Sequence, residues 1–278
     1  CVHLFFVVEI VRRVLVAPAG HERGGEMADK TIIAWTEHTF NVAWGCVKVS
    51  PGCRNCYADD LANRYGHDVW GPGKSRRTFG AAHWVEPLKW DRWARDAGAV
   101  RRVFCSSMCD VFEDHPTIAA EREKLWPLIE ATPNLHWQLL TKRPERIAGN
   151  LPANWEGIRG RVWVGCSVES EEYVGRIDHV RGIDAAVRFV SYEPAIGPIA
   201  HAADLAGIDW LIYGGESGAR RRPEDKQWAR DVMALCRANG TAFFHKQSAH
   251  RFTERGIELD GRIIREYPSP RTALPVIA

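Results

Sequence analysis

Short apolar runs alternate with helical stretches along most of the chain, and this alternation constrains the fold more than any other feature. Seven runs are short and largely apolar, as strands buried on both faces are: Thr31–Trp35, Val103–Ser106, His136–Leu140, Val162–Gly165, Val187–Ser191, Trp210–Tyr213 and Thr241–Phe244. Arg77–His83 is a weaker strand candidate. Four stretches between them have helical character: Cys56–Tyr65, Thr117–Ala131, Glu171–Arg181 and Glu224–Ala238. This order indicates βαβ units and a parallel sheet.

Seven or eight such units predict an α/β fold, a full or partial parallel (β/α) TIM-type barrel. The 278 residues agree with the size of about 250 that is typical of such barrels. A doubly wound open sheet is the second choice. The chain has neither a GxGxxG nor a GxxxxGK[ST] motif, which argues against a nucleotide-binding fold. It also has no apolar run long enough to cross a bilayer, so we expect no membrane association.

The sequence predicts one barrel-like domain over residues 27–278, which includes a cysteine-cluster loop. The chain begins with Cys, and its first Met is Met27, so we interpret residues 1–26 as a non-native or disordered N-terminal extension. The formal net charge of +2 does not by itself indicate a nucleic-acid-binding protein. Three of the eight cysteines cluster, and no convincing secretory signal precedes them. This pattern favours a reducing cytoplasm over a disulfide framework.

Charged or polar residues follow nearly every predicted strand. In a parallel barrel the carboxyl ends of the strands form one rim, where active sites assemble. The residues in these positions are Asp110, Lys142, Arg143, Ser167, Glu169, Glu193, Glu216 and Lys246. Because loops are polar anyway, a single such residue would mean little, but the repetition favours a functional rim.

The cysteine cluster follows the first predicted strand and precedes a predicted helix. Its members are Cys46, Cys53 and Cys56, with the spacing C-x6-C-x2-C and a Pro-Gly turn before the second cysteine. Three thiolates on one loop predict a metal centre, because a C-x2-C pair can face one metal. A structural zinc site would need a fourth ligand. A 4Fe-4S cluster held by three cysteines would leave one iron open. A site without metal is the third alternative.

Several motifs together resemble a known family. They are TEHTFNVAWGC, SPGCRNCYA, SSMCDVFED, LLTKRP, VWVGCSVES, RFVSYEPAIGPI, DWLIYGGESG, FFHKQ and LDGR. They resemble phage and bacterial proteins of unknown function, often called three-Cys-motif proteins, over residues 31–268. That family is in turn similar to radical S-adenosylmethionine enzymes. Those enzymes usually carry C-x3-C-x2-C, so the first gap is longer here. They also use a Gly-Gly-Glu stretch, which matches Gly214, Gly215 and Glu216 after a late strand.

The resemblance implies a phage-type, iron-sulfur enzyme in which the three cysteines ligate a 4Fe-4S cluster and the open iron binds S-adenosylmethionine. It implies that Glu193 or Glu216 holds the methionyl ammonium and that Asp110 binds ribose hydroxyls. Lys142 and Arg143 would bind the carboxylate or a substrate phosphate, since Arg matches planar oxyanions. For each of these residues, a salt bridge at the rim is the structural alternative.

Three functions remain open at this stage. The first is a radical-type enzyme acting on nucleic acid or a nucleotide, motivated by the phage resemblance and by basic runs at 74–77 and 220–222. The second is a zinc-stabilised nucleic-acid-binding or adaptor protein without catalysis, with a partner protein that the sequence does not identify. The third is a metal-dependent hydrolase. It ranks last because the strand ends offer few histidines beyond His245.

Overall fold

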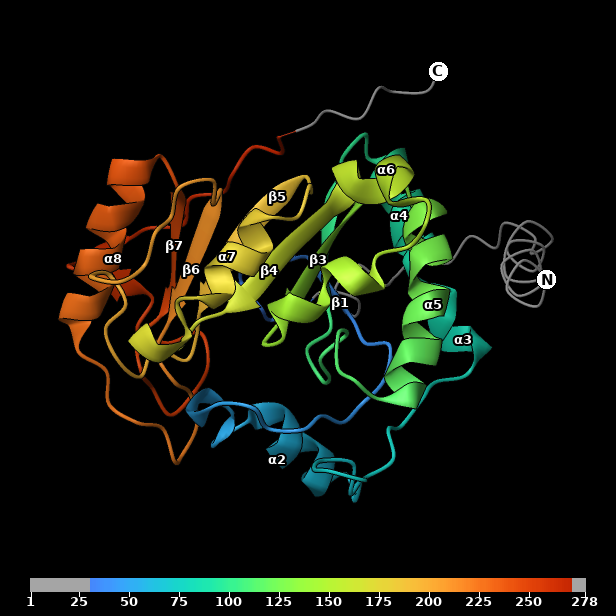
Figure 1. Ribbon diagram of the computed structural model, residues 1–278, viewed down its shortest axis with the longest axis horizontal. Coiled ribbons are helices and arrows are strands. Elements are labelled where there is room, and N and C mark those ends of the chain that lie inside the picture. The colour runs from blue at the N-terminus through green and yellow to red at the C-terminus, as the bar shows by residue number, and fades with distance from the viewer. Residues whose placement is uncertain (1–30, 272–278) are drawn as a thin grey trace.

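The computed structural model describes residues 31–271 and contains a seven-stranded parallel sheet (Figure 1). The strands pair in their order along the chain: β1 (His38–Phe40), β2 (Arg101–Cys105), β3 (Leu135–Thr141), β4 (Val162–Ser167), β5 (Val187–Tyr192), β6 (Trp210–Gly214) and β7 (Ala242–Gln247). Among residues 31–271, β1 and β7 do not pair with each other, so the curled sheet is a partial barrel. The predicted partial parallel barrel is confirmed, and the doubly wound alternative is wrong because its strand order is not sequential.

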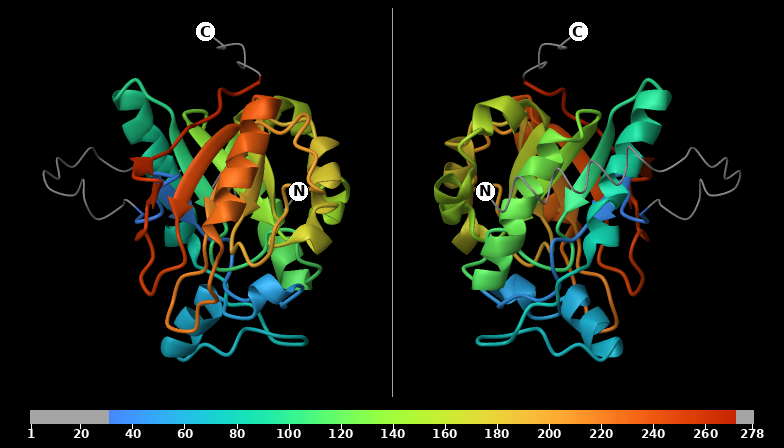
Figure 2. Two further views of the ribbon diagram at one scale, coloured as in Figure 1. Left: turned by 90° about the vertical axis from the view of Figure 1, so that its left-hand side faces the viewer. Right: turned by 90° about the vertical axis from the view of Figure 1, so that its right-hand side faces the viewer.

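Helices cover the outer face of the sheet, while one helix lies apart from it (Figures 1 and 2). The α-helices are α2 (Tyr57–Arg64), α3 (Ala81–Trp84), α4 (Glu86–Asp96), α5 (Pro116–Glu130), α6 (Trp155–Ile158), α7 (Arg176–Arg181) and α8 (Lys226–Asn239). Helix α2 lies beyond the carboxyl ends of the strands, at the lower edge of Figure 1. In the described part of the chain, no helix is long and apolar enough to cross a membrane.

Short elements complete the connections. They are the 3-10 helices η1 (Pro51–Cys53), η2 (Pro144–Arg146), η3 (Ala148–Asn150), η4 (Arg159–Arg161) and η5 (Glu171–Tyr173), and a two-stranded hairpin of β8 (Glu258–Leu259) and β9 (Arg262–Ile263). The hairpin leads the chain back to the sheet, where Arg265 forms an antiparallel bridge with Phe244 of β7.

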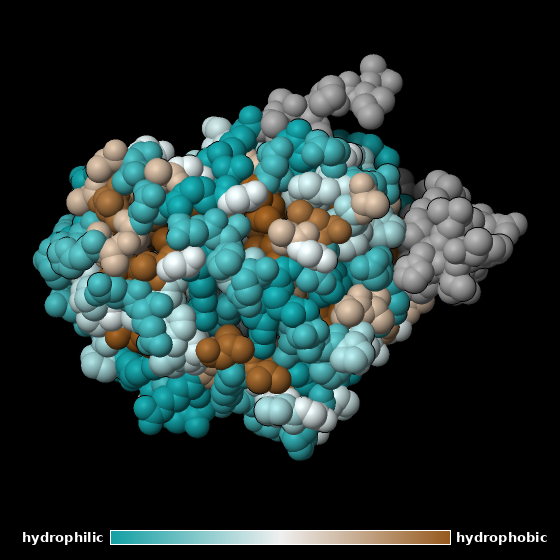
Figure 3. Space-filling view, viewed as in Figure 1, coloured by the Kyte–Doolittle hydropathy of each residue, from teal (hydrophilic) through white to brown (hydrophobic). Residues whose placement is uncertain are grey.

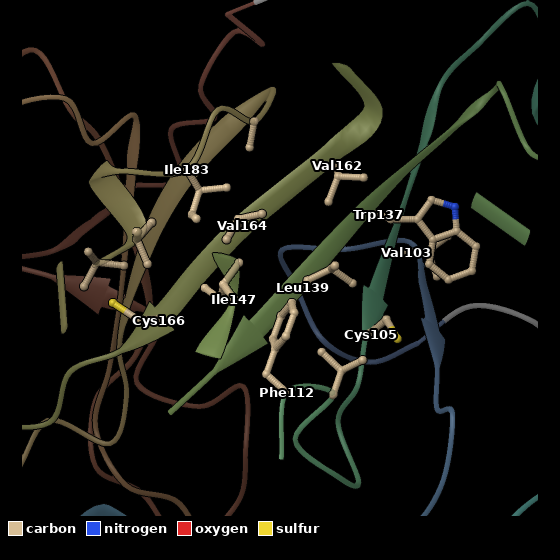
Figure 4. Close-up of a cluster of buried hydrophobic side chains, with 14 of the residues drawn as sticks. Val103, Cys105, Phe112, Trp137, Leu139, Ile147, Val162, Val164, Cys166 and Ile183 are labelled. Atoms are coloured by element: carbon tan, nitrogen blue, oxygen red, sulfur yellow. The ribbon is translucent and has the colours of Figure 1, made fainter. Parts of the chain in front are cut away.

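Both faces of the sheet are buried, which explains why its strands are apolar throughout instead of alternating. The outer face packs against the helices through side chains such as Val103, Trp137, Leu139 and Val164 (Figure 4). The inner face carries a separate group of buried residues with no helix residue among them, here called the inner aromatic cluster. Its buried aromatic members are Trp35, Phe104, Trp163, Phe189, Trp210 and Phe244.

The inner aromatic cluster also covers the gap between the two edge strands. Trp35 precedes β1, and its ring lies 4.6 Å from that of Phe104 and 6.1 Å from that of Trp210, measured between ring centroids. The hydroxyl of Tyr267 donates to the Ala34 carbonyl at 3.0 Å. The two ends of the described chain therefore meet where the barrel is not closed by strand pairing.

Three predicted elements are wrong in detail. The run Thr31–Trp35 is not a strand, and the first strand follows at 38–40. The apolar pattern of this run has another cause, the burial of Trp35 inside the barrel. The stretch Arg77–His83 contains only an isolated bridge from Arg77 to Trp44 and then the start of α3. The helix predicted over Glu171–Arg181 is divided into η5 and α7 around Gly175, since glycine is costly inside a helix. The extension predicted at residues 1–26 lies outside the described residues.

Candidate functional site at the carboxyl ends of the strands

The rim predicted from the sequence exists. Six predicted site residues stand at, or within two residues of, the carboxyl ends of β3, β5 and β6: Lys142, Arg143, Glu193, Gly214, Gly215 and Glu216. Asp110 lies in the loop that follows β2. The cysteine loop, residues 41–56, leaves the end of β1 and reaches the start of α2 on the same side of the sheet (Figure 1). The predicted order of strand, cysteine loop and helix is therefore confirmed.

The three cysteines occupy different parts of the loop. Cys46 is half-buried near its start, Cys53 ends η1, and Cys56 is the residue that caps α2. Burial raises the pKa of the Cys56 thiol, while the backbone N–H groups of Ala58 and Asp59 at the start of α2 act in the opposite direction. Helix α2 thus presents its N-terminal N–H groups to the last cysteine, which offsets part of the effect of burial but leaves the pKa of Cys56 above its usual value.

Glu113 anchors the first part of the cysteine loop. Its buried carboxylate accepts a hydrogen bond of 2.8 Å from the backbone N–H of Val47, directly after Cys46. The same carboxylate is held by the buried guanidinium of Arg76 through hydrogen bonds of 2.9 and 3.0 Å. Gly45 adopts φ of +114°, a conformation that glycine tolerates and other residues rarely adopt. Backbone geometry and a buried ion pair together fix the chain at Cys46.

Arg143 connects Cys46 to the end of β3. One guanidinium nitrogen lies 3.7 Å from the Cys46 sulfur and donates to Asp110 at 2.9 Å, and the other donates to the Val47 carbonyl at 2.9 Å. Asp110 in turn accepts from the Thr141 hydroxyl at 2.7 Å. Burial and the Asp110 charge raise the pKa of the Cys46 thiol, which Arg143 opposes. Arg143 is therefore the cation that stabilises negative charge on the Cys46 sulfur.

Glu169 supports the middle of the loop from beneath. Its carboxylate is fully buried and accepts from the Ser50 hydroxyl at 2.7 Å and from Arg176 at 2.9 Å. Lys142 also pairs with it. A Cβ atom added to Gly52 would lie 2.5 Å from the Glu169 side chain. The glycine of the predicted Pro-Gly turn is thus required by contact with a buried carboxylate.

Glu216 anchors the last part of the loop. Its carboxylate accepts from the Asn55 amide at 3.1 Å and from the backbone and side chain of Arg222 at 2.6 to 3.0 Å. Burial alone would raise the pKa of Glu216, but the hydrogen bonds from Arg222 outweigh it and hold the pKa below its usual value. Arg222 also donates to the Pro51 carbonyl at 3.0 Å. The loop after β6 is thereby tied to the cysteine loop.

The remaining rim residues lie at the ends of β5, β6 and β7. Glu193 pairs with Lys246 at 2.5 Å. A Cβ atom on Gly214 would lie 2.9 Å from the Glu193 carboxyl carbon, and one on Gly215 would collide with the backbone nitrogen of Ala249. The two glycines therefore permit close approach of neighbouring groups.

Residues 30–268 match the family described as Protein of unknown function (DUF5131). The chain belongs to this family. The predicted membership in a family of unknown function is thereby confirmed. A search of curated proteins found no match to the DUF5131 chain.

Comparison of the DUF5131 chain with solved structures returned spore photoproduct lyase. A double mutant with bound AdoMet and dinucleoside spore photoproduct is 14% identical, with a TM-score of 0.44, and the match covers 72% of this chain and 60% of that one. The lyase complexed with dinucleoside spore photoproduct is 14% identical, with a TM-score of 0.45, and the match covers 82% and 77%. The chain spans less than two thirds of the first of these structures.

In the DUF5131 chain, the predicted cofactor-binding residues with charges all have ionic partners. Asp110 pairs with Arg143, Lys142 with Glu169, Glu193 with Lys246 and Glu216 with Arg222. The rim salt bridges that the sequence left as an alternative therefore exist. Sequence reasoning missed the anchoring roles of Glu113 and Arg76, although the position of Glu113 directly after the apolar pair Val111 and Phe112 was a usable signal.

The cysteines of the described segment are free thiols, and none forms a disulfide. Within residues 31–271, no three His, Cys, Asp or Glu side chains are grouped in an arrangement that would hold a single metal ion. In a 4Fe-4S cluster each cysteine binds a different iron, so its sulfurs stand farther apart than ligands that share one ion. Three thiols on one anchored loop, with Arg143 beside one of them, are a donor set suited to such a cluster.

Proposed function

We propose that this DUF5131 protein is an iron-sulfur enzyme of the radical S-adenosylmethionine type that acts on nucleic acid or a nucleotide. One observation carries the proposal: a loop with three thiols lies over the carboxyl ends of a partial parallel barrel, held by three buried carboxylates. Burying a carboxylate is costly unless it is paired. Three such groups beneath one loop indicate that the position of its cysteines matters for function.

Cys46, Cys53 and Cys56 would hold the cluster. When bound, it would supply one-electron chemistry to S-adenosylmethionine at the iron that has no cysteine ligand. The chain's own task is to position the sulfurs. Glu113 fixes the backbone after the first cysteine, Glu169 supports the turn before the second, and Glu216 holds Asn55 beside the third.

Arg143 is the positioning residue for Cys46 in this proposal. Its guanidinium is fixed by Asp110 and by the Val47 carbonyl, so it retains few other conformations in which to bind a ligand. A hydrogen bond to a ligating sulfur stabilises negative charge on that sulfur and tunes the potential of a cluster. Asp110 and Arg143 would thus act through the cysteine loop.

Glu193 and Lys142 are proposed to contact S-adenosylmethionine. Their side chains are 23% and 21% exposed, against 8% for Asp110 and 5% for Glu216. The Glu193 carboxylate would bind the methionyl ammonium, and the Lys142 ammonium would bind the methionyl carboxylate. Each would give up its present ionic partner, Lys246 or Glu169, to do so. Gly214 and Gly215 would support this site indirectly, because their missing side chains let Glu193 and the backbone at Ala249 pack closely against the end of β6.

Anaerobic purification of the full chain, with iron, acid-labile sulfide and zinc analysis and a visible spectrum, tests the proposal. Brown protein with iron and sulfide is expected, and Cys53→Ala is expected to lose both. Cys236→Ala is the matched control, because this buried cysteine lies on α8, away from the loop. Colourless protein with stoichiometric zinc would overturn the proposal and favour the zinc-stabilised nucleic-acid-binding or adaptor protein. Protein without metal would contradict both.

A further inference from the structure

Three loops form one continuous surface at the rim. The loop after β6 touches the cysteine loop through the hydrogen bond of 2.8 Å from the Asn55 amide to the Arg220 carbonyl. The same loop pairs with the loop after β7, since Ser217 and His250 form a parallel bridge. The N–H of Gly218 donates to the His250 carbonyl at 3.1 Å. Side chains from these three loops therefore share one face beside the cysteines.

Most cations of the two basic runs noted in the sequence are committed to partners. Lys74 pairs with Asp68, Arg76 with Glu113, Arg220 with Asp60 and Arg222 with Glu216, while Arg77 stacks on Trp44 and Phe79. The run at 74–77 therefore offers little charge to a ligand. Of the run at 220–222, only Arg221 has no ionic partner within the described residues.

Four exposed arginines on the connected loops have no ion pair within residues 31–271. They are Arg54 of the cysteine loop, Arg221 after β6, and Arg251 and Arg255 after β7. Beside Arg251 stands Phe252, whose side chain is 62% exposed, with the guanidinium 5.8 Å from the ring centroid. We call Arg54, Arg221, Arg251 and Phe252 the basic rim. The lower edge of Figure 3, over α2 and the loops at the strand ends, is largely hydrophilic with a few apolar groups among the polar ones.

An exposed aromatic ring among unpaired arginines suits a specific kind of ligand. Arginine binds phosphate oxygens bidentately, and a flat ring offers a stacking platform for a nucleobase. In a duplex, the base faces are already stacked on one another, so an aromatic side chain stacks best on bases of a single strand. A strand can engage arginines on three loops and a stacking ring at once, whereas a free nucleotide carries its phosphates at one point and an acidic peptide has no base to stack.

We propose that the basic rim binds a single-stranded nucleic acid, with phosphates on Arg54, Arg221 and Arg251 and a base stacked on Phe252. The inference rests on the proposed function, because it delivers the strand to the mouth of the barrel beside the cysteine loop. It narrows the substrate class from nucleic acid or nucleotide to a polymer in single-stranded form.

Fluorescence anisotropy with labelled single-stranded DNA and RNA oligonucleotides of mixed sequence, over a series of salt concentrations, tests the inference. The double variant Arg221→Ala/Arg251→Ala is expected to reduce the slope of log affinity against log salt by about 1.4, since each phosphate contact on a single strand contributes about 0.7. Phe252→Ala is expected to weaken binding about fivefold or more without changing this slope. The DNA and RNA arms identify the natural strand.

Arg237→Ala is the control, because Arg237 is an exposed arginine in the last turn of α8, at the opposite end of the barrel. It is expected to leave affinity and slope unchanged. Equal loss in Arg237→Ala and the rim variants would overturn the inference, as would binding of duplex competitor as tight as that of a single strand. Absence of measurable binding would also overturn it.

The inference and the proposed function fail separately. Metal analysis of the same preparations decides the iron-sulfur proposal without reference to binding. If protein without iron binds single strands and the rim variants weaken this binding, the inference stands and the iron-sulfur proposal is overturned. If iron-loaded protein binds with an affinity that the rim variants do not change, the iron-sulfur proposal stands and the inference is overturned.

Discussion

Toward the amino-terminal half of the sheet the barrel interior is filled by aromatic rings, whereas at the carboxyl ends of the same strands it is crowded with ion pairs. The inner aromatic cluster buries Trp163 and Trp210 with their rings 5.7 Å apart. At the other end, buried carboxylates such as Glu113 and Glu169 hold the cysteine loop. Apolar burial contributes stability with little demand on direction. Buried ion pairs cost desolvation energy but fix the positions of their groups. The aromatic end therefore contributes mainly stability, and the charged end mainly positions the cysteine loop.

The largest expected effect falls on the apolar end. Trp210→Ala removes a fully buried side chain that contacts four other rings of the inner face, so we expect a loss of about 3–5 kcal/mol in the free energy of unfolding. Urea denaturation measures it. A loss below about 1 kcal/mol would show that the aromatic cluster is not what stabilises the barrel.

A smaller effect is expected at the charged end. Glu169→Gln removes the charge that Arg176 and Lys142 share, so we expect about 2 kcal/mol of destabilisation and faster alkylation of Cys53, whose loop it supports. Denaturation and labelling with a thiol reagent measure the two effects. Glu145→Gln is the control, because Glu145 is exposed and is not one of the carboxylates that hold the cysteine loop. Equal labelling rates in both variants would contradict the division between the two ends.

The smallest effect depends on pH and concerns the apolar end. Burial lowers the pKa of His136, whose ring lies 5.8 Å from that of Trp163, from 6.5 to about 4. As the pH falls, His136 is protonated in the unfolded chain before it is protonated in the folded chain. The folded state is therefore most stable above pH 6.5, and this stability is lost as the pH falls toward 4. We expect a loss on the order of 1–2 kcal/mol, reduced by the partial exposure of the ring.

Denaturation curves across this pH range measure the change. The variant His136→Gln, which cannot take up the proton, is expected to lose less stability over the same interval. Parallel curves for the variant and the unchanged chain would mean that the titrating group lies elsewhere.

The sheet was predictable because its strands are buried on both faces and therefore form uninterrupted apolar runs, such as Val187–Ser191 against the observed Val187–Tyr192. The run at Thr31–Trp35 misled for the same reason: burial of Trp35 inside the barrel produces the same pattern as burial in a strand. Helix α4 escaped notice, although Pro87 in its first turn is a usual sign of a helix start.

The candidate site divides in the same way. The cysteine loop was predictable because its residues are neighbours in sequence and its chemistry is carried by their type. The anchors were not, because Glu113, Arg76 and Arg143 meet only in the folded chain, and their charges are ordinary until burial makes them partners. Spacing along the chain singles out the cysteines, whereas the residues that position them are brought together by the topology.

The anchors of the cysteine loop also set an order of assembly. Ser50 meets Glu169 across 119 residues of sequence, and Asn55 meets Glu216 across 161. Contacts this distant in sequence form late, because long stretches of chain must be closed before they are gained. On a ribosome the loop emerges early, yet it lacks its last support, Glu216, until β6 has been made and added to the sheet. The cysteine loop therefore reaches its final geometry only when the sheet is nearly complete.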